Sequence, residues 1–205
     1  MSRLKNKYIA VEGVIGVGKT TLAKLLSDYL EAELILEIVE ENPFLSEFYD
    51  DISGKAFQTQ IFFLLSRYRQ MKKYFQINAF QTNIVSDYMF IKDSIFAGLT
   101  LNNTELVMYE MLFGILNKKC VQPDLVIYLY ADLERIIDRI QYRNRPFEKN
   151  IQSEYIRNLM HAYEKFFSSY HECPIIKVDT NNINYVKSFK QFDKLLSDIK
   201  KVLQE

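Results

Sequence analysis

A glycine-rich loop within "YIAVEGVIGVGKTTLAK", residues 8–24, constrains the fold more than any other stretch of the chain. Gly13, Gly18, Lys19 and Thr20 have the spacing G-x-x-x-x-G-K-[ST], and the loop lies between a short apolar run and a helical pattern. Glycines let the backbone turn its N–H groups inward, the following helix adds the positive end of its dipole, and Lys19 supplies a full charge. The loop therefore predicts a nucleotide phosphate site between a buried strand and a helix.

The predicted nucleotide contacts come from the whole loop and the first residues of its helix. These residues are Gly13, Val14, Ile15, Gly16, Val17, Gly18, Lys19, Thr20 and Thr21. Thr20 is the expected Mg²⁺ ligand, because this position of the motif carries a metal-binding hydroxyl. The motif leaves open whether the terminal phosphate goes to water, as in a switch or motor protein, or to a second substrate.

Apolar runs of strand length alternate with longer segments in which apolar residues recur every three or four positions. The predicted strands are residues 8–12, 33–38, 83–87, 124–131 and 174–179. The predicted helices are residues 18–31, 55–80, 103–118, 132–143, 153–170 and 185–203. This alternation predicts an α/β protein with a parallel sheet and helices on both of its faces. Residues 40–54 and 142–152 do not fit the pattern, because the first contains Asn-Pro and Ser-Gly breakers and the second is a charged interruption.

The composition favours one domain, residues 1–205, that binds small molecules. The 26 basic and 26 acidic residues cancel, so no net charge draws the chain to nucleic acid or to an anionic membrane. Cys120 and Cys173 lack the spacing of a zinc site and are expected to be reduced core residues. The N-terminus has too few apolar residues for a signal peptide and no run approaches 18 apolar residues, so we expect a cytoplasmic protein.

Carboxylates stand at the ends of three predicted strands, where an open parallel sheet binds its ligands. They are Glu12, Glu37 and Asp87. Asp87 could reach the Mg²⁺ held by Thr20 if its strand lies beside the first strand. Glu37 is a candidate base for an acceptor hydroxyl, although position alone favours a solvated carboxylate.

Arginines are concentrated in "RIIDRIQYRNRPFEKN". Arg135, Arg139 and Arg143 are four residues apart on one predicted helix face, and Arg145 follows in a loop. Arg139, Arg143 and Arg145 are expected to stabilise the charge on a transferring phosphoryl group. Acidic neighbours flank Arg135, which favours a solvated helix face for that residue.

The chain resembles the deoxynucleoside kinases, most closely the bacterial deoxyguanosine and deoxyadenosine kinases. The resemblance rests on "EGVIGVGKTTL", "EIVEENPFLSEFY", "FQTQIFFLLSRYRQ", "SDYMFIKDSIFA" and "RNRPFEKNI", which follow one another in the family's order. It implies the P-loop kinase fold with a five-stranded parallel sheet, an arginine-bearing lid at about residues 143–151, and transfer of the ATP γ-phosphate to the 5′-hydroxyl of a purine deoxynucleoside. It also implies a homodimer built on helices, and "ELVMYEMLFGILNKK" could form either that interface or buried core.

The resemblance assigns Glu37 to the carboxylate that takes the 5′-hydroxyl proton, which reverses the interpretation from position alone. Tyr49 and Glu148 match the pair that holds the sugar 3′-hydroxyl, and Asp87 matches the acid at the third strand end. The family's lid arginines correspond to Arg139, Arg143 and Arg145.

The resemblance also implies a base pocket. Gln60 matches the glutamine that meets the base edge, Arg67 and Asp93 match the pair beside it, and Phe96 would pack on the base face. Gln60 and Arg67 are seven residues apart, so they project from the same helix face. Arg67 could donate to guanine O6 and Asp93 could accept from adenine N6, so the preferred purine stays open.

Many family members have an acid-Arg-Ser triplet where this chain has Asp87-Tyr88-Met89. Either Lys92 or a lid arginine substitutes for the missing arginine, or Tyr88 marks the purine-specific bacterial branch, which the neighbouring motifs favour. A nucleoside monophosphate kinase would need further arginines for its acceptor, and Glu37 and Glu148 would oppose an anion. A switch-type nucleotide-binding protein is the second alternative. The sequence assigns no role to Glu12.

Overall fold

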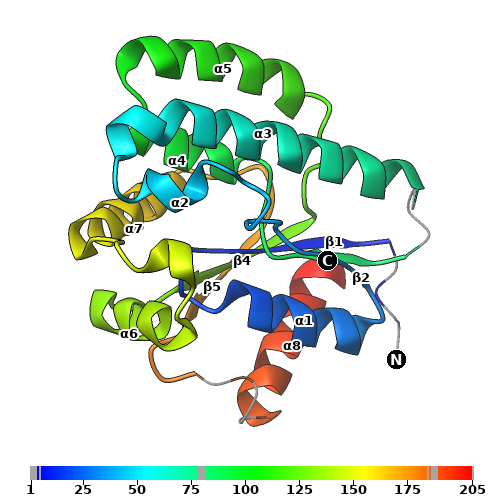
Figure 1. Ribbon diagram of the computed structural model, residues 1–205. Helices are drawn as coiled ribbons and strands as arrows, with labels where there is room; N and C mark the ends of the chain where they lie inside the picture. Colours follow the sequence, from blue (N-terminus) through cyan, green and yellow to red (C-terminus); the bar gives the residue numbers. More distant parts are fainter. Residues whose placement is uncertain (1–3, 5, 78–81, 184, 186–188, 205) are drawn as a thin grey trace.

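The computed structural model describes residues 4, 6–77, 82–183, 185 and 189–204. Its five strands form one parallel sheet in the order β2-β3-β1-β4-β5 (Figure 1). The strands are β1 (Tyr8–Glu12), β2 (Glu33–Ile35), β3 (Ile84–Ser86), β4 (Leu125–Tyr130) and β5 (Ile175–Asp179). The predicted parallel sheet is therefore confirmed.

Helices cover both faces of the sheet, as the alternation predicts. They are α1 (Lys19–Leu30), α2 (Leu45–Phe48), α3 (Ile52–Ile77), α4 (Lys92–Thr100), α5 (Asn103–Asn117), α6 (Leu133–Arg143), α7 (Ser153–Ser168) and α8 (Phe189–Gln204), with the 3₁₀ helix η1 (Pro146–Glu148). In Figure 1, α3, α4 and α5 lie above the sheet and α1 and α8 lie below it. None of the helices in the described ranges is long and apolar enough to span a membrane.

The central strands form the core. All five residues of β1 are buried, and Ile9 and Val11 are fully inaccessible to solvent. Each such side chain contributes about 1.5–3 kcal/mol through its burial. Because helices cover both faces, these strands are continuous apolar runs, which is why the sequence pattern located them.

Strand β2 is shorter than predicted: it ends at Ile35, not at residue 38. It lies at the sheet edge and pairs with β3, which itself ends at Ser86. Beyond that point the backbone leaves the sheet, and the Glu37 N–H donates to Asp87 Oδ1 at 2.8 Å. Glu37 therefore lies in the loop after β2 and not in a strand.

Helix α3 begins three residues before the predicted residue 55. Asp51 Oδ1 accepts hydrogen bonds from Gly54 N at 3.0 Å and Ser53 Oγ at 3.3 Å, so Asp51 caps the helix. The interpretation of Ser53-Gly54 as a breaker is wrong, because both residues lie in the first turn of α3. The predicted end of this helix, residues 78–80, lies outside the described residues.

Helix α4 was not predicted. The run from Tyr88 to Leu101 is apolar on several sides and contains Gly98, so it lacks a clear helical period. Helix α7 ends at Ser168, two residues before its predicted end. The predicted helix from residue 185 is described from Phe189, and residues 186–188 lie outside the described residues. Cys120 and Cys173 are free thiols and partly buried.

Candidate active site

The loop between β1 and α1 has the backbone geometry of a phosphate cradle. Gly13, Gly16 and Gly18 have φ values of 145°, 84° and 109°, which side chains disfavour. A Cβ atom on Gly13 would lie 2.3 Å from Leu129 O, so only glycine fits there. Since α1 begins at Lys19, the N–H groups of its first turn face the loop and can bind an anion.

Lys19 reaches back over the loop. Its Nζ donates to Gly13 O at 2.8 Å and to Val14 O at 3.0 Å. Burial lowers the pKa of Lys19 to about 8, and the nearby cation Lys92 contributes in the same direction. An anion bound at the loop would place a negative charge next to the Lys19 ammonium group.

A cavity of about 440 Å³ lies over the loop. It is lined by Gly16, Val17, Gly18, Lys19, Thr20, Thr21, Leu22, Leu129, Arg139, Tyr142, Arg143, Thr180, Ile183 and Tyr185. Of the predicted nucleotide contacts, Gly13, Val14 and Ile15 are not among these residues. We refer to this space as the loop cavity.

Arg139 lines the loop cavity and contacts the residue that follows β5. It donates to Val17 O at 3.0 Å, to Thr180 Oγ1 at 3.0 Å and to Thr180 O at 2.6 Å. Arg135, predicted as a solvated residue, donates from Nε to Asn181 O at 3.1 Å on the exposed surface. The segment after β5 thus forms one wall of the loop cavity.

A second cavity, of about 290 Å³, lies between the loop, α2, α3 and α4. It is lined by Ile15, Lys19, Thr20, Lys24, Leu36, Glu37, Val39, Glu40, Leu45, Phe48, Tyr49, Thr59, Gln60, Phe63, Arg67, Asp87, Lys92, Phe96, Arg143, Arg145, Phe147 and Glu148. We refer to it as the inner cavity. Lys19, Thr20 and Arg143 line both cavities, so the two spaces meet at these side chains.

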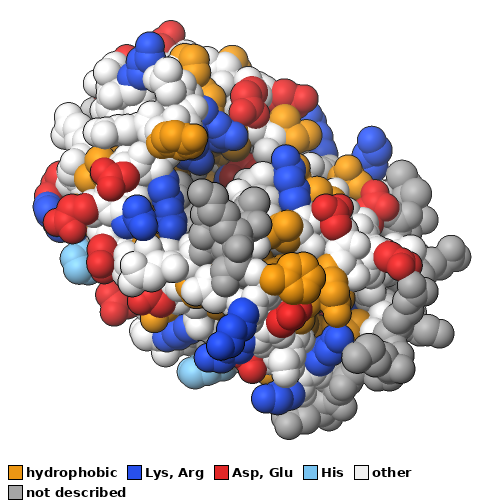
Figure 2. All heavy atoms as spheres, turned by 90° about the horizontal axis from the view of Figure 1, so that it is seen from below, with side chains coloured by type: hydrophobic (Ala, Val, Ile, Leu, Met, Phe, Trp, Pro, Cys, Tyr) orange, Lys and Arg blue, Asp and Glu red, His pale blue; other side chains and the backbone are white. Residues whose placement is uncertain are grey.

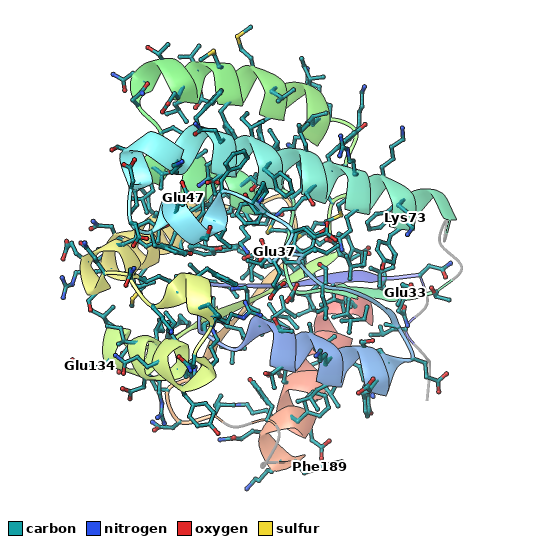
Figure 3. The ribbon with its side chains drawn as sticks, viewed as in Figure 1. Glu33, Glu37, Glu47, Lys73, Glu134 and Phe189 are labelled. Atoms are coloured by element: carbon teal, nitrogen blue, oxygen red, sulfur yellow. The ribbon has the colours of Figure 1, made fainter. Side chains whose placement is uncertain are left out.

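Glu37 lies near the middle of the molecule, below α3 in Figure 3. Its carboxylate is paired with two cations: Oε1 accepts from Arg67, and Oε2 accepts from Lys92 Nζ at 2.7 Å. Burial alone would raise the pKa of Glu37, but Arg67 and Lys92 outweigh it and hold the pKa well below its usual range. Glu37 is therefore ionised and can accept a hydrogen bond from a hydroxyl group.

Helices α3 and α4 supply the polar groups at one end of the inner cavity. Gln60 and Arg67 both lie on α3, are almost fully buried and line the cavity, as their spacing predicts. The Gln60 amide donates to Thr100 Oγ1 at 3.3 Å. Asp93 is fully buried behind Arg67 and pairs with it, so it does not line the cavity. Phe96 contributes an aromatic wall.

The other end of the inner cavity is closed by the segment after α6. Arg143 Nε donates to Glu148 Oε2 at 2.7 Å, and a second hydrogen bond from Arg143 reaches Glu148 Oε1. Glu148 is 5% exposed. Arg145 Nη2 lies 3.6 Å from Glu40 Oε1, and the Arg145 guanidinium group lies over the Phe147 ring. Tyr49 lines the cavity beside them, and burial, with contributions from Tyr155 and Glu148, raises the pKa of its hydroxyl.

Thr20 and Asp87 are the residues best placed to hold a cation. Thr20 Oγ1 donates to Asp87 Oδ2 at 2.5 Å, directly beneath the loop. Magnesium prefers such oxygen donors and commonly takes only one or two of them from the protein, with phosphate oxygens supplying others. The described residues contain no cluster of three or more His, Cys, Asp or Glu side chains that could hold a metal ion.

The structure adds residues to the candidate site that sequence reasoning missed or left unassigned. Glu12 is fully buried and accepts hydrogen bonds from Gly13 N at 3.0 Å, Met89 N at 2.7 Å and the Tyr163 hydroxyl at 3.3 Å. It therefore ties the start of the loop to the segment that leads into α4. No sequence motif marks Thr180, Ile183 or Tyr185, and their only signal is their place after the last strand.

Among the described residues on the side that carries α8, basic and acidic side chains are interspersed, as Figure 2 shows. This distribution agrees with the neutral overall charge. Several charged side chains also line the inner cavity, among them Lys19, Glu37 and Arg67.

Comparison with known proteins adds independent information. The deoxynucleoside kinase family model matches residues 9–204. The chain is similar to a deoxyguanosine kinase of Bacillus subtilis (strain 168), with 35% identity covering 96% of this chain and 97% of the relative. It is also similar to a deoxyadenosine/deoxycytidine kinase of the same organism, with 31% identity covering 98% and 95%. The structure of M. mycoides deoxyadenosine kinase with bound dCTP superposes with a TM-score of 0.80 and 28% identity, covering 93% of this chain and 99% of that one.

Proposed function

Because this chain belongs to the deoxynucleoside kinase family, we propose that it transfers the γ-phosphoryl group of ATP to the 5′-hydroxyl of a purine deoxynucleoside. The products are ADP and the deoxynucleoside 5′-monophosphate, as expected of a salvage enzyme. The observation that carries the proposal is the junction of the two cavities. Lys19, Thr20 and Arg143 line both, and the Glu37 carboxylate lies in the inner one.

In the proposed reaction, ATP occupies the loop cavity with its phosphates against the loop N–H groups and Lys19. The acceptor occupies the inner cavity with its 5′-oxygen near Glu37. A bond forms from the 5′-oxygen to the γ-phosphorus, the bond to the bridging oxygen of ADP breaks, and Glu37 takes the hydroxyl proton. Arg139, Arg143 and Arg145 stabilise the charge on the transferring group. Thr20 and Asp87 would hold Mg²⁺, which would neutralise phosphate charge.

The sugar end of the acceptor is assigned to Tyr49 and Glu148, whose oxygens can hydrogen-bond a 3′-hydroxyl. Glu148 is held in place by Arg143 through two hydrogen bonds. Residues 143–151 form the proposed lid, because this segment carries Arg143, which lines both cavities, and the Glu148 carboxylate of the acceptor side. Closure of the lid would exclude water from the transferring group.

The base end supports a preference for guanine over adenine. Asp93 is paired with Arg67 and lies behind it, so Arg67 and Gln60 are the groups that face the cavity. A guanidinium donates only, which suits guanine O6 and N7 and does not suit the adenine amino group. Phe96 would pack against the face of the purine ring.

The experiment that tests this proposal measures initial rates with deoxyguanosine, deoxyadenosine and deoxycytidine, each with ATP and with GTP as donor. Acceptor-dependent formation of a 5′-monophosphate is expected, fastest with deoxyguanosine. ATP hydrolysis that is independent of any acceptor would instead support a switch-type protein. Faster turnover of deoxyadenosine would refute the base assignment and leave the kinase assignment intact.

A homodimer is also proposed, built on α5. Val107, Met108, Met111 and Ile115 are 49–70% exposed and form an apolar face on this outermost helix (Figure 1). Such a face on a surface helix is typical of a protein interface. Light scattering should give a dimer for the wild type and for the surface control Lys190→Glu, and a monomer for Met111→Glu. A monomeric wild type at micromolar concentration would refute the dimer.

A further inference from the structure

The Glu37 carboxylate has two cationic partners, and only one of them has a second task in the proposed reaction. Arg67 also pairs with the buried Asp93 and faces the base end of the inner cavity. A purine that accepts hydrogen bonds from Arg67 would compete with Glu37 for that guanidinium group. Glu37 Oε1 would then become available to the acceptor hydroxyl.

Lys92 has no such competing role. It is 4% exposed, its Nζ lies 2.7 Å from Glu37 Oε2, and it lines the inner cavity beside Lys19 and Thr20. Its backbone N–H donates to Met89 O at 3.1 Å, and Met89 N donates to the buried Glu12. These hydrogen bonds connect the start of α4 to the start of the phosphate loop, and they hold the backbone of Lys92 in place.

The other cations that line both cavities or close the inner one point elsewhere in this structure. Lys19 donates to the loop carbonyls, and Arg143 and Arg145 lie against Glu148. Tyr88, which stands where many relatives have an arginine, is fully buried and donates to Gln70 Oε1 at 2.5 Å. Tyr88 therefore cannot hold Glu37, whereas Lys92, four residues later, does.

Resting on the proposed function, we infer that Lys92 is the positioning residue for Glu37 during phosphoryl transfer. It holds Oε2 of the carboxylate so that Oε1 faces the 5′-hydroxyl once the nucleobase has engaged Arg67. Lysine suits this task because its compact ammonium group has three donors and can keep one on Glu37. The arginine absent at Tyr88 is thus replaced from the first turn of α4.

A double-mutant cycle tests this role, because residues that act as a unit lose activity non-additively. The variants are Lys92→Met, Glu37→Gln and the combination of both, with the surface variant Lys55→Met as a matched control. Lys92→Met should lower kcat about 10- to 100-fold, the size of one charge-assisted hydrogen bond, with little change in the KM for ATP. The double variant should be no slower than Glu37→Gln alone, and Lys92→Arg should recover much of the lost turnover.

If the fold-losses in kcat of the two single variants multiply in the double variant, the inference is overturned. Full turnover by Lys92→Met would also overturn it. If Lys92→Met is unfolded at the assay temperature, Lys92→Gln takes its place in the same cycle, because it keeps a donor and removes the charge. Wild-type protein without acceptor-dependent transfer would contradict the proposed function itself. If the wild type transfers the phosphoryl group but the effects of the two substitutions are additive, only the role of Lys92 is contradicted.

Discussion

Replacing Glu37 by glutamine probes the reaction at a single atom. The substitution keeps the size of the side chain and one oxygen but removes the charge and the ability to take a proton. Base catalysis of this kind contributes about 10²- to 10⁴-fold, so kcat should fall by that factor. The corresponding rise in the activation free energy is about 3–5 kcal/mol.

The same substitution has a structural cost that must be separated from the loss of catalysis. Glu37 is 13% exposed at its side chain and neutralises Arg67 and Lys92. Arg67 keeps Asp93 as a partner, and the glutamine oxygen can still accept one hydrogen bond. We therefore expect a decrease of about 1–3 kcal/mol in the free energy of unfolding, and a folded variant.

Initial rates of deoxyguanosine phosphorylation with saturating ATP measure the effect on turnover, and calorimetric titration measures nucleoside affinity. Glu47→Gln is the matched control, because Glu47 is exposed on α2 and pairs only with Lys55 among the described contacts (Figure 3). The control should keep wild-type turnover, and Glu37→Gln should bind nucleoside with little change. Unchanged turnover in Glu37→Gln would refute its role as the base.

Three further substitutions test the remaining parts of the site. Lys19→Ala should abolish measurable ATP-dependent transfer, and an active variant would mean that the loop is not the phosphate cradle. Gln60→Leu should raise the KM for the nucleoside far more than the KM for ATP, whereas equal changes would place Gln60 outside the base pocket. Gly13→Ala should lower the melting temperature and the ATP affinity, because the added Cβ would lie 2.3 Å from Leu129 O, and wild-type values for both would refute the strain argument.

The sequence predicted those parts of the molecule whose signals are local. The glycine spacing located the loop between β1 and α1, and continuous apolar runs located the strands because the central ones are buried on both faces. Gln60 and Arg67 were placed on one helix face by their separation of two turns. The resemblance then brought Tyr49, Phe96 and Glu148 into the same pocket, where the structure also places them.

What the sequence did not predict depends on contacts between distant segments. Thr180 Oγ1 lies 3.3 Å from Val17 O, across 163 residues, and no sequence motif marks Thr180 as a partner of the loop. Helix α4 was missed because burial on several sides removes the amphipathic pattern. The end of β2 could not be placed either, since it depends on where its neighbour β3 ends.

The central claim is that one phosphoryl group passes between two cavities that meet at Lys19, Thr20 and Arg143. The most direct measurement follows ADP and deoxyguanosine 5′-monophosphate together in one reaction of the wild-type protein with ATP and deoxyguanosine. The account predicts equal amounts of the two products and negligible ADP when the nucleoside is omitted. ADP formed at the same rate without nucleoside, or without any monophosphate product, would contradict it.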